Sequence, residues 1–138
     1  MSQWLLRIAG LYLVAGITLG IVMAASHDHS QMPLHAHLNL LGWVTLGLVG
    51  LWYRVQPEAS KTMLARIHFT LHNLALPVLA VALYNILRGN EAAEPFAAGA
   101  SIVIGIGVLC LVANIWRHTA PAASTAAAAA PARATATP

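Results

Sequence analysis

The chain has 138 residues, of which 59% are hydrophobic and only 8% are charged. A soluble domain of this length needs more charged residues to cover its surface, so the composition favours a membrane protein. Seven Lys and Arg residues against four Asp and Glu residues give a formal net charge of +3. The basic residues form no run, which argues against a nucleic-acid-binding patch. Cys110 is the single cysteine, so the chain has no internal disulfide.

Four long apolar runs, separated by three short polar loops, predict four membrane-spanning helices. About 20 apolar residues cross a bilayer as a helix. The expected helices cover about residues 4–25, 34–53, 63–87 and 96–116. We therefore predict an all-α fold, a four-transmembrane-helix bundle that occupies residues 1–118 as one domain. Residues 119–138 are rich in Ala, Pro and Thr and have too few large apolar residues for a core, so disorder is expected there.

The first apolar run has an alternative interpretation as a cleaved signal peptide that ends at Ala24-Ala25-Ser26. Signal peptides have about 7–15 apolar residues, whereas this run is longer and Met23 spoils the cleavage motif. A membrane span is therefore favoured. Small residues recur one turn apart in the first run and again in the fourth, and both stripes permit close helix packing. These stripes are Gly16, Gly20 and Ala24, and Ala97, Ser101 and Gly105.

The basic residues predict the orientation in the membrane. The second run ends in Trp52-Tyr53-Arg54, which is typical of an interfacial aromatic belt and a basic anchor. Lys61 and Arg66 also flank the second loop, whereas the first loop has no Lys or Arg and the third sets Arg88 against two glutamates. The positive-inside rule then places both termini in the cytoplasm. We expect a multi-pass protein of a bacterial inner membrane, with the first loop in the periplasm.

Four of the seven histidines, His27, His29, His35 and His37, precede or open the second apolar run. Titratable side chains at the mouth of a membrane helix are costly to keep there, so they indicate a functional site. Each helical residue turns about 100°, so His35 and His37 point to opposite sides and cannot both bind one metal ion. The alternative is that these are solvated loop residues and amphipathic side chains at the membrane surface.

His68 and His72, in the third run, are four residues apart and share one helix face. This is a usual spacing for two ligands of one ion, or for a ligand and its supporting partner. The alternative is two structural histidines that bond to polar neighbours in the same helix. If the second loop is centred near Glu58, His72 lies about 10 Å deeper than His37. We therefore predict two separate layers of histidines, and no haem shared by His37 and His72 of one chain.

The segment from His35 to Trp43, HAHLNLLGW, resembles the signature of small four-helix proteins described as cytochrome-c-oxidase-subunit-I-like. The resemblance covers the four helices, and the RIHF and HNL segments around His68 and His72 are similar to the same group. This group in turn resembles the main subunit of haem–copper oxidases and nitric-oxide reductases. That subunit contains twelve helices in three four-helix units, and the second helix of each unit carries ligand histidines near the outer surface.

The resemblance implies that this chain corresponds to one such four-helix unit and that His35 and His37 are haem ligands. Asn39, one turn after His35, is then placed to hydrogen-bond a ligand ring or a haem propionate, and Trp43 to pack against the porphyrin. The further ligand candidates in the third helix are His68 and His72, of which His72 is also a cofactor-binding candidate. The adjacent histidine pair that helps to bind copper in oxidases is absent, so an oxygen-reducing haem–copper centre is not implied.

The sequence supports three hypotheses. The first is an oxidoreductase-like membrane protein that binds haem b, transfers electrons to or from a redox partner or handles O₂ or NO, and forms a homotrimer in which His35 and His37 come from neighbouring copies. The second is a periplasm-facing copper-handling protein, because imidazole and thioether groups suit copper. Its ligands would be His27, His29, Met32 and His35. The third is an assembly subunit without a cofactor.

Overall fold

The computed structural model describes residues 1–119, and every regular element in this range is a helix. Four long rods span Ser2–Ser26, Met32–Val55, Met63–Ile86 and Glu91–Thr119, and each is long and apolar enough to cross a membrane. This confirms the predicted all-α fold with four membrane-spanning candidates. Disorder was predicted for residues 119–138. Residues 120–138 lie outside the described residues.

The second rod is one continuous helical run made of three parts. It begins as α2 (Met32–His37), continues as the π-helix η1 (Leu38–Thr45) and ends as α3 (Leu46–Val55). Pro33 lies in the first turn of α2, where its missing N–H is not needed. In η1 the Thr45 hydroxyl donates a hydrogen bond of 2.8 Å to the carbonyl of Leu40, five residues earlier. π-helical turns are rare and often mark functional sites, and this one directly follows the two histidines.

The other rods are α-helices with short 3₁₀ turns between them. The first is α1 (Ser2–Ser26), and α4 (Met63–Ile86) follows the 3₁₀ turn η2 (Ala59–Lys61). Thr62 caps α4, because its hydroxyl oxygen accepts the N–H of Ala65 at 3.1 Å. The fourth rod opens with the 3₁₀ turn η3 (Glu91–Ala93) and continues as α5 (Glu94–Thr119).

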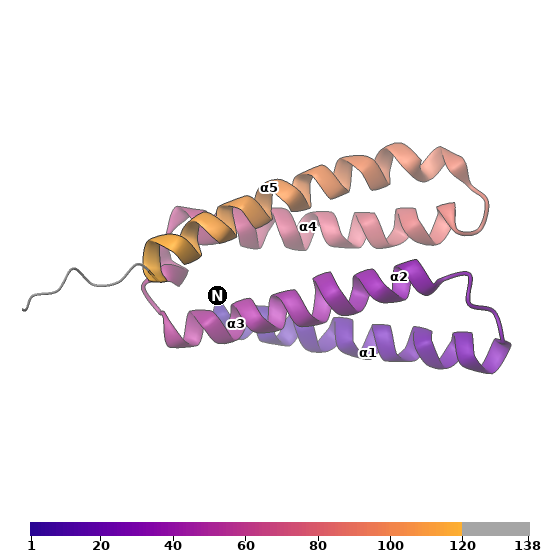
Figure 1. Ribbon diagram of the computed structural model, residues 1–138, viewed down its shortest axis with the longest axis horizontal. Coiled ribbons are helices and arrows are strands. Elements are labelled where there is room, and N and C mark those ends of the chain that lie inside the picture. Colours follow the sequence, from indigo (N-terminus) through magenta and orange to yellow (C-terminus); the bar gives the residue numbers. More distant parts are fainter. Residues whose placement is uncertain (120–138) are drawn as a thin grey trace, which may run out of the picture.

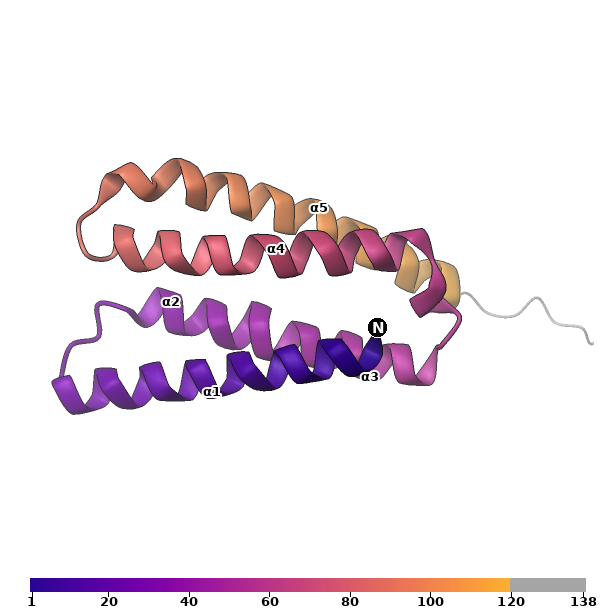
Figure 2. The same ribbon diagram turned by 180° about the vertical axis from the view of Figure 1, so that it is seen from behind.

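The four rods form two antiparallel helix hairpins that lie side by side (Figures 1 and 2). In one hairpin α1 packs against α3 and η1, and in the other α4 packs against α5. The Ser2 hydroxyl donates to the carbonyl of Gly50 at 2.8 Å, which fixes the start of α1 beside α3. The C-terminal end of α5 and the second loop lie at the same end of the molecule, and the histidine-bearing first loop lies at the opposite end (Figure 1).

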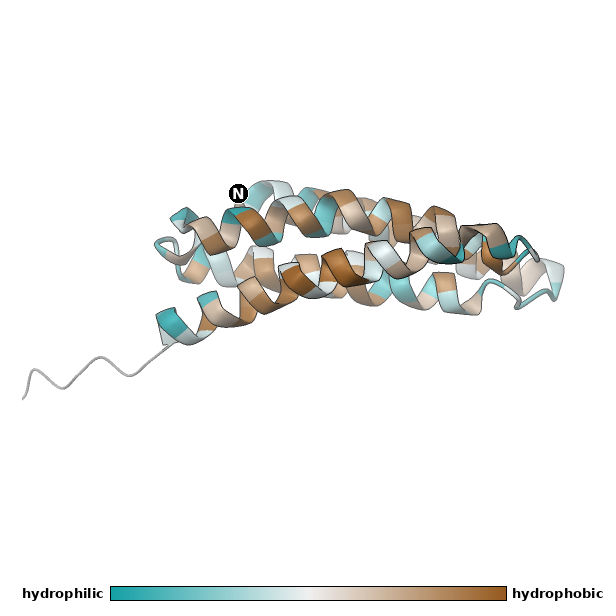
Figure 3. Cartoon of the chain, turned by 90° about the horizontal axis from the view of Figure 1, so that it is seen from above, coloured by the Kyte–Doolittle hydropathy of each residue, from teal (hydrophilic) through white to brown (hydrophobic). Residues whose placement is uncertain are grey.

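The outer faces of the rods are apolar. Hydrophilic loops lie at both ends of the molecule, and apolar residues line the helices between them (Figure 3). Large apolar side chains are exposed on every rod, among them Leu11, Leu48, Val81 and Leu109. Apolar outward faces of this extent suit lipid tails and not water, so the structure fits a multi-pass membrane protein.

A buried polar network joins the hairpins near the second loop. Asn114 is fully buried, and its Nδ2 donates to the carbonyl of Ala59 at 3.0 Å and lies 3.4 Å from the Tyr53 hydroxyl. The hydroxyl of Thr62 donates to Asn114 Oδ1 at 3.0 Å. Tyr53 is only 2% exposed, so it is a core residue and not the interfacial anchor predicted from its position next to Arg54.

Candidate histidine site

His35 projects from α2 toward α1, where two glycines make room for it. Its Nδ1 lies 2.9 Å from the carbonyl oxygen of Gly16, and because a carbonyl only accepts, Nδ1 must carry the proton. A Cβ added to Gly20 would lie 3.0 Å from Cε1 of the His35 ring. A Cβ added to Gly16 would lie 2.6 Å from the amide atoms of Asn39. The predicted close packing at Gly16 and Gly20 is therefore confirmed.

Asn39 holds the other side of the His35 ring, while the ligand role expected for this ring stays a prediction. Its Nδ2 donates to the backbone carbonyl of His35 at 2.9 Å and lies 3.3 Å from His35 Nε2. Since Nδ1 of His35 carries the proton, Nε2 offers a lone pair, which the Asn39 amide occupies. A metal ion that bound this nitrogen would have to displace the amide.

His37 also lies in α2, about 200° around the helix from His35. Its Nδ1 donates to the carbonyl of Pro33 at 2.7 Å, so Nε2 again carries a lone pair. The ring is half-buried, and within the described residues Nε2 makes no hydrogen bond. His37 therefore presents an oriented imidazole with one open nitrogen, which is the arrangement that metal-ligating histidines adopt.

The surface beside α2 is apolar. In η1, Leu40 is 60% exposed, and Trp43 and Val44 are also partly exposed. The Trp43 ring lies over Gly47, where an added Cβ would be 3.7 Å from it. Trp43 thus lies on the α1 side of the rod, near Ala9, whereas Leu40 follows His37 by about one turn and adds exposed aliphatic surface on that side.

His68 and His72 lie together inside the bundle. Both are fully buried on α4, and their ring centroids are 5.2 Å apart. His72 Nε2 donates to the carbonyl of Leu41 in η1 at 3.1 Å. Both nitrogens of His68 and Nδ1 of His72 have no hydrogen-bond partner among the described residues. The predicted shared face is present, while the ring bond of His72 goes to another helix and not to a neighbour in α4.

The hydrogen bond between His72 and Leu41 relates the two histidine layers to each other. It pairs His72 with Leu41, which lies four residues after His37 and therefore deeper in the second rod. This is the direction that counting from Glu58 predicted. The ring of His72 is held against the η1 backbone, and the structure does not bring it to the open nitrogen of His37.

His27 and His29 lie in the first loop and are exposed. His27 ends α1 in the left-handed conformation, with φ of 56°. The next residue, Asp28, accepts the N–H of Ser30 at 2.9 Å, and this bond lowers the pKa of its carboxyl group. Across residues 1–119, no three His, Cys, Asp or Glu side chains gather closely enough to hold a metal ion, so the histidines of the copper hypothesis are not assembled within one chain.

Some close helix contacts were not predicted from the sequence, among them those of Gly42 and Gly107. Gly42 in η1 packs directly against the Tyr12 ring of α1, and Gly107 in α5 packs against the α4 backbone at His68. Of the predicted small-residue stripe in the fourth helix, Ala97 packs against the core cluster around Leu76, whereas a Cβ on Gly105 would meet nothing within 4 Å. Isolated glycines in apolar helices are the signal for such contacts, but the sequence does not say which glycine faces a neighbour.

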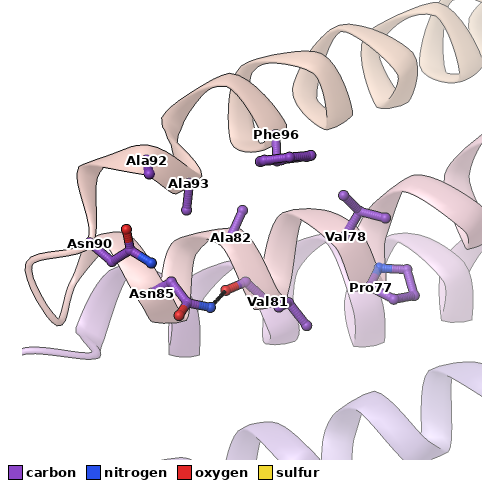
Figure 4. Close-up of a pocket in the computed structure, with 9 residues that line it drawn as sticks. All are labelled: Pro77, Val78, Val81, Ala82, Asn85, Asn90, Ala92, Ala93 and Phe96. Carbon is purple, nitrogen blue, oxygen red and sulfur yellow. Dashed lines mark hydrogen bonds between the residues drawn. The ribbon is translucent and has the colours of Figure 1, made fainter.

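A cavity of about 600 Å³ opens between the end of α4 and the start of α5 (Figure 4). Its walls are apolar, with Pro77 and Phe96 at one end and the amides of Asn85 and Asn90 at the other. No histidine lines it. The cavity is therefore separate from the three groups of histidines in this part of the chain.

No protein-family model, no curated protein and no solved structure matches this chain. The fold and the histidines define the class: a multi-pass, all-helical membrane protein with two oriented imidazoles at the start of its second rod and a buried imidazole pair in its third.

Proposed function

We propose that this protein binds haem b in the inner membrane of a bacterium and takes part in electron transfer or in handling O₂ or NO. The observation that carries the proposal is His37, whose Nδ1 is bonded to the carbonyl of Pro33 at 2.7 Å while Nε2 stays open on the flank of the helix. An imidazole with one N–H held by a carbonyl and the other nitrogen free is ready to be an axial ligand of haem iron.

The fit of haem to this surface rests on the residues around His37. Leu40, 60% exposed and about one turn after His37, supplies apolar surface against which a porphyrin ring can pack. Haem iron, when bound, supplies one-electron redox chemistry and a binding position for a diatomic gas. The chain itself supplies the oriented imidazole, and the apolar side chains exclude water from that flank.

The second axial ligand comes, in this proposal, from another copy of the chain. Within one chain His35 faces α1, where Gly16 and Asn39 occupy its two ring nitrogens, and His72 is bonded to Leu41. No second imidazole therefore lies opposite His37 within the described residues. A homotrimer would place second rods next to one another and supply twelve helices. His35 would join as a ligand only after the Asn39 amide leaves its Nε2.

The test is the visible spectrum of the purified protein and of two variants. The wild type is expected to show a Soret band and a bis-imidazole haem b spectrum, with iron in proportion to haem. His37→Ala is expected to abolish this spectrum. His118→Ala is the matched control, because the Nδ1 of His118 also bonds a carbonyl four residues earlier, that of Asn114 at 2.9 Å, at the opposite end of the fold.

The oligomer is tested on the same samples by mass determination in mild detergent. A haem-loaded monomer would contradict the shared site. Full haem retention in His37→Ala, with unchanged helicity by circular dichroism, would contradict the role of His37. Iron-free wild-type protein, purified after expression with an ample haem supply, would contradict the proposed cofactor.

A further inference from the structure

Two cavities lie end to end between α4 and α5. The first is the apolar cavity of about 600 Å³ beside the third loop (Figure 4), and a second of about 340 Å³ lies farther from that loop. Val78 and Phe96 line both cavities and are 46% and 65% exposed, so the cavities open sideways on a face that meets lipid tails. We call the two cavities together the α4–α5 groove. The haem proposal uses none of its lining residues, so the groove calls for a separate explanation.

The length of the α4–α5 groove matches an acyl chain of one leaflet. Along α4 the groove runs from Asn85, near the end of the helix, back to Leu74, eleven residues earlier. Eleven residues correspond to about 16 Å of helix rise, and half of the hydrocarbon core of a bilayer is about 15 Å thick. An acyl chain from the leaflet on this side therefore fits along the groove, with its polar end at the third loop.

The end of the groove at the third loop is polar. Its lining residues there are Asn85 and Asn90, whereas the rest of the lining is apolar. One N–H of Asn85 is donated to the carbonyl of Val81 at 2.8 Å, so the second N–H remains for a ligand. The Asn90 side chain does not cap the helical turn that follows it. Amide N–H groups at the boundary of the membrane suit the ester carbonyl that joins an acyl chain to its headgroup.

The charges around this end select the headgroup. The third loop and the start of α5 carry Arg88, Glu91 and Glu94, and all three side chains are exposed. Arg88 donates a hydrogen bond to the Tyr84 hydroxyl and lies over the Tyr84 ring, which holds the guanidinium at the end of α4. A guanidinium pairs with a phosphate and carboxylates pair with an ammonium group, while two carboxylates against one cation disfavour an anionic lipid. A zwitterionic headgroup with an ammonium group is therefore favoured.

We propose that the α4–α5 groove binds one phosphatidylethanolamine molecule per chain. One acyl chain lies along the groove, and its ester carbonyl accepts an N–H from the amides of Asn85 and Asn90. The phosphate pairs with Arg88, and the ammonium group pairs with the carboxylates beside it. The site needs only one copy of the chain, and it does not rest on the haem proposal.

The test adds phosphatidylethanolamine or phosphatidylglycerol, with the same acyl chains, to the full-length protein in mild detergent and counts bound lipids by native mass spectrometry. We expect one tightly bound phosphatidylethanolamine per chain. Phosphatidylglycerol is expected to bind about fivefold more weakly, which is the effect of about one charge at a membrane surface. The double variant Glu91→Gln/Glu94→Gln is expected to remove this preference, and Arg88→Gln is expected to weaken the binding of both lipids.

A matched pair of glycine variants tests the groove itself. Gly99 lines the second cavity, and a Cβ added there meets nothing within 4 Å, so Gly99→Leu fills the groove without disturbing the helix packing. Binding of phosphatidylethanolamine is expected to fall by about tenfold or more. Gly105→Leu is the control, because Gly105 is equally open on the same helix but lines neither cavity. Circular dichroism checks that both variants keep the helicity of the wild type.

Four outcomes would overturn the proposal. Unchanged binding in Gly99→Leu would place the lipid elsewhere, and an equal loss in both glycine variants would indicate a lipid that binds anywhere on the apolar surface. Stronger binding of phosphatidylglycerol would contradict the choice of headgroup. A dimer of chains that Gly99→Leu dissociates, with no bound lipid, would assign the groove to a second copy. The Soret band of each variant is recorded in parallel and is expected to be unchanged, so that failure of the lipid site is told apart from failure of the haem site.

Discussion

At the scale of single residues, two glycines of α1, Gly16 and Gly20, determine how His35 is held. Gly16 supplies both a carbonyl for the His35 ring, at 2.9 Å, and the space that the Asn39 amide occupies. The ring and the amide are thus fixed by backbone and by close approach, with no bulky side chain between the helices.

Gly16→Ala is therefore expected to destabilise the protein by about 1–3 kcal/mol, because its Cβ would overlap Asn39 at 2.6 Å. Thermal unfolding in detergent, followed by circular dichroism, measures the loss. Gly10→Ala is the matched control in the same helix, where an added Cβ meets nothing within 4 Å. The control is expected to be neutral or slightly stabilising, because alanine is the better helix former. Equal effects of the two changes would contradict the contact.

Asn114 gives a second residue-scale prediction. Its side chain bonds Ala59 and Thr62 and approaches Tyr53, so Asn114→Ala leaves buried polar groups unsatisfied. The expected loss is about 1–3 kcal/mol of unfolding free energy. Ser101→Ala serves as the control, since the Ser101 hydroxyl makes only a local, exposed bond to Ala97. An unchanged melting temperature for Asn114→Ala would show that the network contributes no net stability.

At the scale of elements, the π-helix η1 is the feature that sets the second rod apart. It separates α2, which carries His35 and His37, from α3, which packs into the core near the second loop. A wider turn changes the angular relation between residues before and after it. The direction in which the histidines point relative to the core is therefore set by η1 as well as by their spacing.

The Thr45 hydroxyl supports this segment through its 2.8 Å bond to Leu40. Thr45→Val removes the bond and keeps the shape, so we expect a local loss of about 0.6 kcal/mol. Hydrogen exchange should report this as roughly threefold faster exchange of the amides over residues 38–45. Thr70→Val is the control, because Thr70 is exposed on α4 and its hydroxyl makes no hydrogen bond among the described residues. Faster exchange in both variants would assign the effect to something other than η1.

At the scale of the whole molecule, the arrangement of rods makes the orientation testable. The start of α1, the second loop and residue 119 share one end, and the first and third loops share the other. The basic residues Arg54, Lys61 and Arg66 gather at the first of these ends, which the positive-inside rule assigns to the cytoplasm.

Fusions of an export-dependent reporter at residues 30 and 58 are expected to be active at 30 and inactive at 58. A reporter that works only in the cytoplasm, fused at the same two positions, should give the opposite pattern. Activity of the export-dependent reporter at 58 alone would reverse the orientation and place His27 and His29 inside the cell.

The sequence by itself determined the class and the main elements. Long apolar runs specify membrane-length helices because each must satisfy its own backbone hydrogen bonds in lipid. The spacing of His35 and His37 also determined that they face apart, since both lie in the regular turns of α2.

Only the tertiary structure decided what these residues meet. Nothing local requires the π turn of η1, the burial of Tyr53 beside Asn114, or the bond from His72 to Leu41. Each depends on how one rod lies against another, and glycines such as Gly42 allow a close approach without specifying the partner. The tautomer of His35 is set in the same way, because its Nδ1 meets the Gly16 carbonyl of α1, whereas the bonds of His35 to Asn39 and of His37 to Pro33 are local.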